Sequence, residues 1–162
     1  MRRLAAGVLL AFAAPVAGKD SLGMFDAWGA FRDSGAGRCY AIAMPQPSRA
    51  ARDYRAFASV GSWPKRGVRG QVHFRLSRKL AAQPSVVLAV GRQRFELTGG
   101  GGDAWARDRA MDAAIVAAMR SAGSLSVSAR DTRGRRFTDR YDLRGAATAM
   151  DAATVGCASI RR

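Results

Sequence analysis

The chain is short of the residues that most enzyme and metal sites need. Its 162 residues include one histidine (His73), one glutamate (Glu96), two cysteines (Cys39 and Cys157) and no asparagine. A zinc site, a Ser-His-Asp hydrolase and a glycosidase with a pair of glutamates are therefore poorly supplied. We expect no metal, no cofactor and no catalytic residue. The protein is thus expected not to be an enzyme, and a hydrolase is kept as a minor alternative.

Acidic residues are also scarce. The chain has 12 of them against 27 basic residues, which gives a formal net charge of +15, and all but three of the basic residues are arginines. Apolar residues make up 48% of the chain, which is enough for a core and excludes wholesale disorder. At this length a single domain is expected.

The N-terminus has the three parts of a secretory signal peptide. Arg2 and Arg3 precede an apolar run over residues 4–14, and Pro15 is followed by the small residues that precede a cleavage site. The run is too short to span a membrane, and no later run is long enough, so no membrane span is expected. A buried N-terminal helix is the alternative. Cleavage near Gly18 would leave one domain over residues 19–162 in the periplasm or outside the cell.

The two cysteines permit a single intramolecular pairing. An exported chain with an even number of cysteines predicts a disulfide, here between Cys39 and Cys157. Two unpaired thiols are the alternative.

Short apolar stretches recur along the chain between turn residues. Alternation of apolar and polar residues over residues 68–76 predicts a half-buried strand, and residues 86–90 and 94–98 predict a hairpin. Further strands are expected over residues 26–31, 39–44, 54–60, 125–129 and 135–143. Helices are expected over residues 108–121, with Asp108 as N-cap, and over residues 146–153. About eight strands with short connections predict a mainly β protein, an antiparallel sandwich or barrel-like sheet pair with two short helices.

Three further features are interpreted as structural rather than functional. The four glycines at residues 99–102 are followed by no phosphate-binding motif and are interpreted as a flexible loop. His73 lies on the polar side of its expected strand and is interpreted as a solvated surface residue. Asp139 falls on the inward side of its strand, where a structural ion pair with an arginine is expected rather than a catalytic acid.

Positive charge gathers in two stretches, residues 65–79 and 130–144. Outward strand positions are expected for Arg75, Arg94, Arg136 and Arg140. If their strands are neighbours, one sheet carries a basic face that attracts polyanions such as lipopolysaccharide or acidic glycans. No nucleic-acid-binding motif accompanies it, so nucleic acid is not expected as a partner. The alternative is that the charge serves solubility only.

The order of motifs resembles the invasion-associated locus B family of exported bacterial proteins. The matching segments follow one another over about 130 residues, nearly the whole of the expected mature chain; they include Trp28, Cys39-Tyr40, Trp63-Pro64-Lys65-Arg66-Gly67, Phe95-Glu96-Leu97, Ala104-Trp105, Met119-Arg120-Ser121-Ala122-Gly123 and Thr138-Asp139-Arg140-Tyr141-Asp142-Leu143. The resemblance implies an exported, β-rich protein with no defining enzymatic activity, and the two cysteines match the positions of those in the family.

The expected function is therefore an exported, non-enzymatic binding or envelope-associated protein. The alternative is a surface protein that binds polyanions through an arginine-rich sheet face. In either case the partner would be an anionic component of the envelope or of a host surface. The oligomeric state stays open.

Overall fold

The computed structural model describes residues 18–161, so nearly all of the expected signal peptide lies outside the described residues. The mainly β class is confirmed. The strands are β1 (Lys19–Phe25), β2 (Trp28–Asp33), β3 (Arg38–Ala43), β4 (Phe57–Trp63), β5 (Val68–Arg75), β6 (Val86–Val90), β7 (Gln93–Gly100), β8 (Asp103–Trp105), β9 (Ser124–Arg130) and β10 (Arg136–Asp142). The helices are α1 (Arg109–Ser121) and α2 (Ala146–Gly156), with short 3₁₀ turns η1 (Pro64–Arg66) and η2 (Cys157–Arg161).

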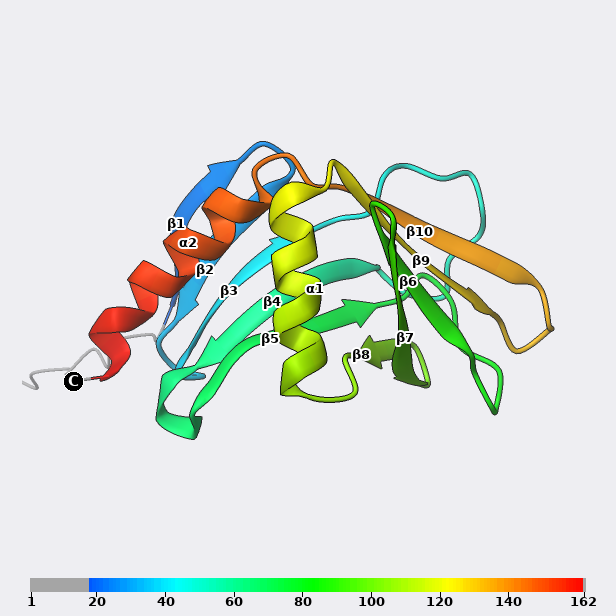
Figure 1. The fold of residues 1–162 in the computed structure, drawn as a ribbon, viewed down its shortest axis with the longest axis horizontal. Helices are drawn as coiled ribbons and strands as arrows, with labels where there is room; N and C mark the ends of the chain where they lie inside the picture. The colour runs from blue at the N-terminus through cyan, green and yellow to red at the C-terminus, as the bar shows by residue number, and fades with distance from the viewer. Residues whose placement is uncertain (1–17, 162) are drawn as a thin grey trace, which may run out of the picture.

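All ten strands described belong to one sheet in the order β1-β2-β3-β4-β5-β8-β7-β6-β9-β10, and every pairing is antiparallel. Where the sequence predicted a pair of sheets, the strands form this single sheet, in which two halves can be distinguished, β1–β5 and β7-β6-β9-β10. The short strand β8 joins them, because it pairs with β5 on one side and β7 on the other. In Figure 1 the strands of the second half run at a steep angle to those of the first.

Both helices pack on one face of this sheet (Figure 1): α2 lies against β1, β2 and β3, and α1 lies mainly against β5. Small and β-branched residues in register across the strands form the floor under the helices, as in the row Ala30, Ala41, Val60 and Val72. Alternate residues of each strand therefore face the helices, and the residues between them face away on a helix-free side.

Helix α1 matches the prediction in both position and cap. The Asp108 carboxylate accepts a hydrogen bond from the Met111 N–H at 2.8 Å, and Ile115, Ala118 and Met119 are buried. The hydrogen bond from Met111 and the neighbouring Arg107 guanidinium hold the pKa of Asp108 below its ordinary value against a smaller effect of burial. The cap thus satisfies one of the N–H groups that a helix start leaves open.

The two strands that the sequence did not predict are β1 and β8. Asp26, with φ of 48°, turns the chain from β1 into β2, so the strand expected over residues 26–31 begins only at Trp28, as β2. The glycine run is not a flexible loop, because Gly99 and Gly100 end β7 and pair with β8, and only Gly101 and Gly102 form the tight turn between the two strands. A Cβ at Gly102 would lie 2.2 Å from the Tyr54 ring, so the glycines allow a close approach that other residues would prevent.

The predicted disulfide is confirmed. Cys39 in β3 and Cys157 at the end of α2 are bonded, with their Cα atoms 5.6 Å apart. The bond fixes the C-terminal helix to the sheet and closes a loop between residues 118 positions apart. Within residues 18–161, neither helix has the length and apolar character needed to cross a membrane.

Candidate functional site

A hollow of about 510 Å³ opens on the helix-free side of β6, β9 and β10. Its floor consists of short side chains because the register places Ala89 beside Ser126 and Val87 beside Ser128, and Ser128 beside Thr138. The Ser128 and Thr138 hydroxyls lie 2.9 Å apart and are hydrogen-bonded to each other. The floor is therefore shallow, small and partly polar.

Arginines form the rim of this hollow: Arg94 from β7, Arg130 from β9 and Arg136 from β10. We call it the arginine hollow, with these three residues as its rim and Ser126, Ser128 and Thr138 as its floor. Arg130 donates to the Gly134 carbonyl at 2.7 Å. Among residues 18–161, Arg94 and Arg136 have no carboxylate partner. The sequence analysis did not include Arg130 in this site. The turn over residues 131–135 places Arg130 directly opposite Arg136 in the hairpin, and this signal was present in the sequence.

Arg140 lies beside the arginine hollow. It lines a second depression of about 270 Å³ that shares Ala89 and Ser126 with the first. Arg94 and Arg140 stand at opposite ends of one cross-strand row, Arg94-Ala89-Ser126-Arg140. Three strand spacings separate their backbones, about 14 Å. Three of the four predicted arginines are thus brought together.

Arg75 is the exception. Its guanidinium is ion-paired with Asp103 and lies 3.9 Å from the centroid of the Tyr54 ring. In the sheet, Asp103 of β8 lies opposite Gly100 of β7. Gly100 is six residues from Arg94, which is about 20 Å along β7. Arg75 therefore does not join the arginine hollow, and its charge is already compensated.

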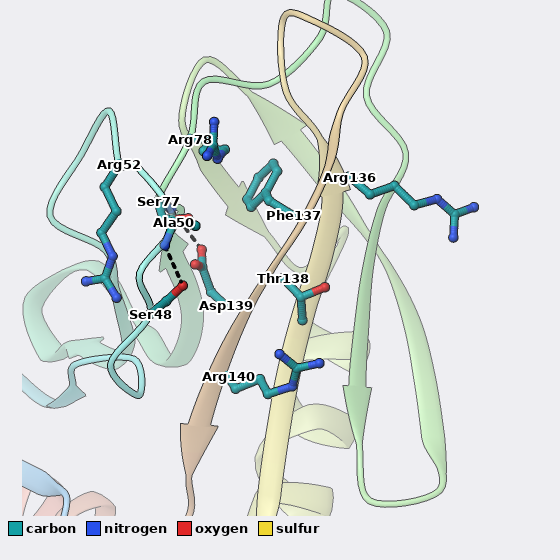
Figure 2. Close-up of a pocket in the computed structure, with 10 residues that line it drawn as sticks. All are labelled: Ser48, Ala50, Arg52, Ser77, Arg78, Arg136, Phe137, Thr138, Asp139 and Arg140. Atoms are coloured by element: carbon teal, nitrogen blue, oxygen red, sulfur yellow. Dashed lines mark hydrogen bonds between the residues drawn. The ribbon is translucent and has the colours of Figure 1, made fainter.

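Strand β10 sends alternate side chains to opposite sides (Figure 2): Arg136, Thr138 and Arg140 to one, Phe137 and Asp139 to the other. Asp139 is buried, as an inward position predicts, with 6% of its surface exposed. Its partner, however, is the N–H of Ser77 at 2.8 Å, and no arginine of the described chain pairs with it. A hydrogen bond to backbone thus stands in place of the expected ion pair, because the chain that leaves β5 after Arg75 passes Asp139 and presents the Ser77 N–H to it.

The turn between β9 and β10 is held by a second aspartate. Asp131, only 2% exposed, accepts hydrogen bonds from the N–H groups of Arg133 and Arg135 and from the guanidinium groups of Arg78 and Arg135. Burial raises the pKa of this carboxyl, but the donors of Arg135 and Arg133 outweigh it, so the pKa lies below its ordinary value. The turn that carries Arg130 and Arg136 is therefore well anchored.

His73 is not the solvated residue that its strand position suggested. Its ring stacks on Trp105 at 5.2 Å and meets Phe57 edge-on at 5.4 Å, and its Nε2 lies 3.0 Å from Asp103. Neighbouring strands cause this, since β8 places Trp105 opposite His73. The Ser59 hydroxyl, on the next strand, donates at 3.4 Å to the His73 carbonyl and not to its ring. The cluster packs aromatic surface on the helix-free side of the sheet.

No group of three or more His, Cys, Asp or Glu that could hold a metal occurs in the described part of the chain. Comparison of the chain with protein-family models, with curated proteins and with solved structures finds no match. The function must therefore be argued from the arrangement of the residues themselves, and the arginine hollow is its most specific chemical feature.

Proposed function

We propose that the protein is an exported, non-enzymatic binding protein and that it binds an anionic polymer, such as lipopolysaccharide or an acidic glycan, through the arginine hollow. The observation that carries the proposal is the gathering of Arg94, Arg136 and Arg140 around one small-residue floor without carboxylate partners in the described chain. Guanidinium groups are well suited to sulfate and phosphate, which they bind through paired N–H donors.

The distribution of aspartates supports this site over a general basic surface. Ion pairs neutralise arginines elsewhere in the sheet and on the helices: Arg32 with Asp20, Arg38 with Asp33, Arg75 with Asp103, Arg120 with Asp151. On the floor and rim of the arginine hollow no carboxylate is found among the lining residues. Uncompensated positive charge therefore lies at a place where the surface is also hollowed.

The spacing of the arginines indicates a polymer rather than a single small ion. Arg94 and Arg140 are about 14 Å apart across the strands, and Arg136 and Arg140 are a similar distance apart along β10. Positive charge is thus spread over an area, which suits a ligand with repeated negative charges. The disulfide and the resemblance to exported invasion-associated locus B proteins support a location outside the cytoplasm.

Retention on immobilised heparin at several salt concentrations tests the proposal. The variant Arg94→Gln/Arg136→Gln should lower the slope of log affinity against log salt by about 1.5, because each charged contact contributes roughly 0.7 to 0.9. The matched control Lys65→Gln/Arg66→Gln removes the same charge from exposed residues at the η1 turn and should leave the slope unchanged. Equal losses in both variants would show that net charge alone retains the protein.

A further inference from the structure

Strand β10 has an open edge. The C=O of Arg140 accepts a hydrogen bond from the Gln46 N–H at 2.7 Å, and the C=O of Asp142 accepts one from the Trp28 indole at 2.8 Å, so the even-numbered residues of β10 direct their backbone groups away from β9. Since backbone groups alternate along an antiparallel strand, those of Arg136 and Thr138 point to the same edge. No hydrogen bond to them from another part of the described chain occurs there.

Another hollow, separate from the arginine hollow and from the depression beside Arg140, runs along this edge and has a volume of about 300 Å³. We call it the edge slot. It is lined by Ser48, Ala50, Arg52, Ser77, Arg78 and the five consecutive residues 136–140. In Figure 2 the segment that carries Ser48, Ala50 and Arg52 stands apart from β10 on the far side of the slot. That segment is bonded to β10 at Gln46 but not between residues 47 and 52.

Charge argues for what the slot can hold. Arg136 and Arg140 extend from β10 on the helix-free side, and Arg52 stands across the slot. A second copy of β10 paired about Thr138 would place Arg136 opposite Arg140, and such like charges are unfavourable in a strand pair. An extended peptide with carboxylates at the positions opposite Arg136 and Arg140 would form opposite-charge pairs instead.

We propose that the edge slot binds an extended acidic peptide of a partner protein, which adds to the sheet as a strand beside β10. Residues opposite Arg136 and Thr138 would direct their N–H and C=O groups at the free groups of β10, whereas the C=O of Arg140 is already bonded to Gln46 and its partner residue would pair through charge. The residues between them would face Phe137 and Asp139, whose carboxylate is already bonded to the Ser77 N–H, so uncharged side chains suit these positions. The recognised pattern is therefore acidic, apolar, Thr or Ser, apolar, acidic. This proposal does not depend on polyanion binding at the arginine hollow.

The test uses a capped fluorescent peptide with the core Glu-Val-Thr-Val-Glu and the full-length protein, with affinity measured by fluorescence anisotropy. In an antiparallel pairing the Thr and the last Glu lie opposite Thr138 and Arg136, so N-methylation of these two residues blocks the N–H groups that pair with β10, and we expect the affinity to fall at least tenfold. N-methylation of the two Val residues, whose N–H groups point away from β10, is the matched control and should have a small effect. Equal binding of the two methylated peptides would overturn the proposal.

Protein variants give an independent test. Thr138→Pro removes the edge N–H and places the proline ring in the path of an added strand, which an edge strand can tolerate. Thr138→Val loses the same hydroxyl and keeps the N–H. We expect the first variant to abolish peptide binding and the second to retain it. Equal affinities in the two variants would refute strand addition, and if Thr138→Pro does not fold, the methylated peptides decide.

Heparin separates the two sites. Arg94→Glu should lower heparin retention but leave peptide affinity within about twofold, because Arg94 does not line the edge slot. If Arg94→Glu lowers both peptide affinity and heparin retention, and if N-methylation does not change peptide affinity, the peptide binds as another polyanion at the arginine hollow. That result would overturn the edge slot proposal. Heparin retention unchanged in Arg94→Glu, with methyl-sensitive peptide binding, would refute the proposed function while supporting the edge slot.

Discussion

Removal of the disulfide between Cys39 and Cys157 should cost a large part of the stability of the protein. The bonded residues are 118 positions apart, so the chain-entropy relation gives about 16 cal/mol/K, or about 5 kcal/mol at 25 °C. Measured losses for native disulfides are about 2 to 5 kcal/mol. A domain of this size is stable by roughly 5 to 15 kcal/mol, so the reduced protein should still fold with a much smaller margin.

Urea unfolding of the oxidised protein and of the variant Cys39→Ala/Cys157→Ala measures this loss. With an m-value of about 2 kcal/mol/M, a loss of 2 to 5 kcal/mol moves the midpoint down by about 1 to 2.5 M. The reduced wild-type protein keeps both sulfur atoms in the core, so it separates the cross-link from the packing of the side chains. A midpoint shift below about 0.3 M in both samples would refute the reasoning, since it would mean that the bond does not restrict the unfolded chain.

Two further predictions concern carboxylates. Glu96 faces the same side of β7 as Arg94; Glu96→Gln should raise heparin affinity about twofold, because one negative charge about 10 Å from a bound anion costs about 0.4 kcal/mol in water. A lower affinity would contradict the placement of the site. Burial raises the pKa of Asp112, and this effect outweighs the hydrogen bond from the Val72 N–H, which lowers the pKa. The stability that protonated Asp112 contributes is therefore present below the unfolded pKa of about 3.9 and is lost as pH rises through the higher folded pKa. Asp112→Asn keeps an acceptor for Val72 and should therefore gain stability relative to wild type between pH 4 and 7 in thermal unfolding; a difference that does not change with pH would count against it.

Local pattern was sufficient for much of the fold. The alternation in β5, the apolar run of β6 and the capped helix α1 were predicted because each buries its own periodic face, whatever its neighbours are. Strands β1 and β8 could not be predicted, because residues 19–25 and 103–105 have no such period and become strands through the backbone groups of β2, β5 and β7.

The sequence alone therefore determined the mainly β class, the excess of arginine and the identity of the disulfide, since composition, periodicity and the presence of only two cysteines require no knowledge of strand order. Only the tertiary structure decided which charges act together. Register across β7, β6, β9 and β10 gathers Arg94, Arg136 and Arg140, while β8 places Asp103 beside Arg75 and removes it from the group. The physical reason is that ion pairs and surface hollows depend on distances of a few ångströms between strands, which residues far apart in the chain set only when the sheet is complete.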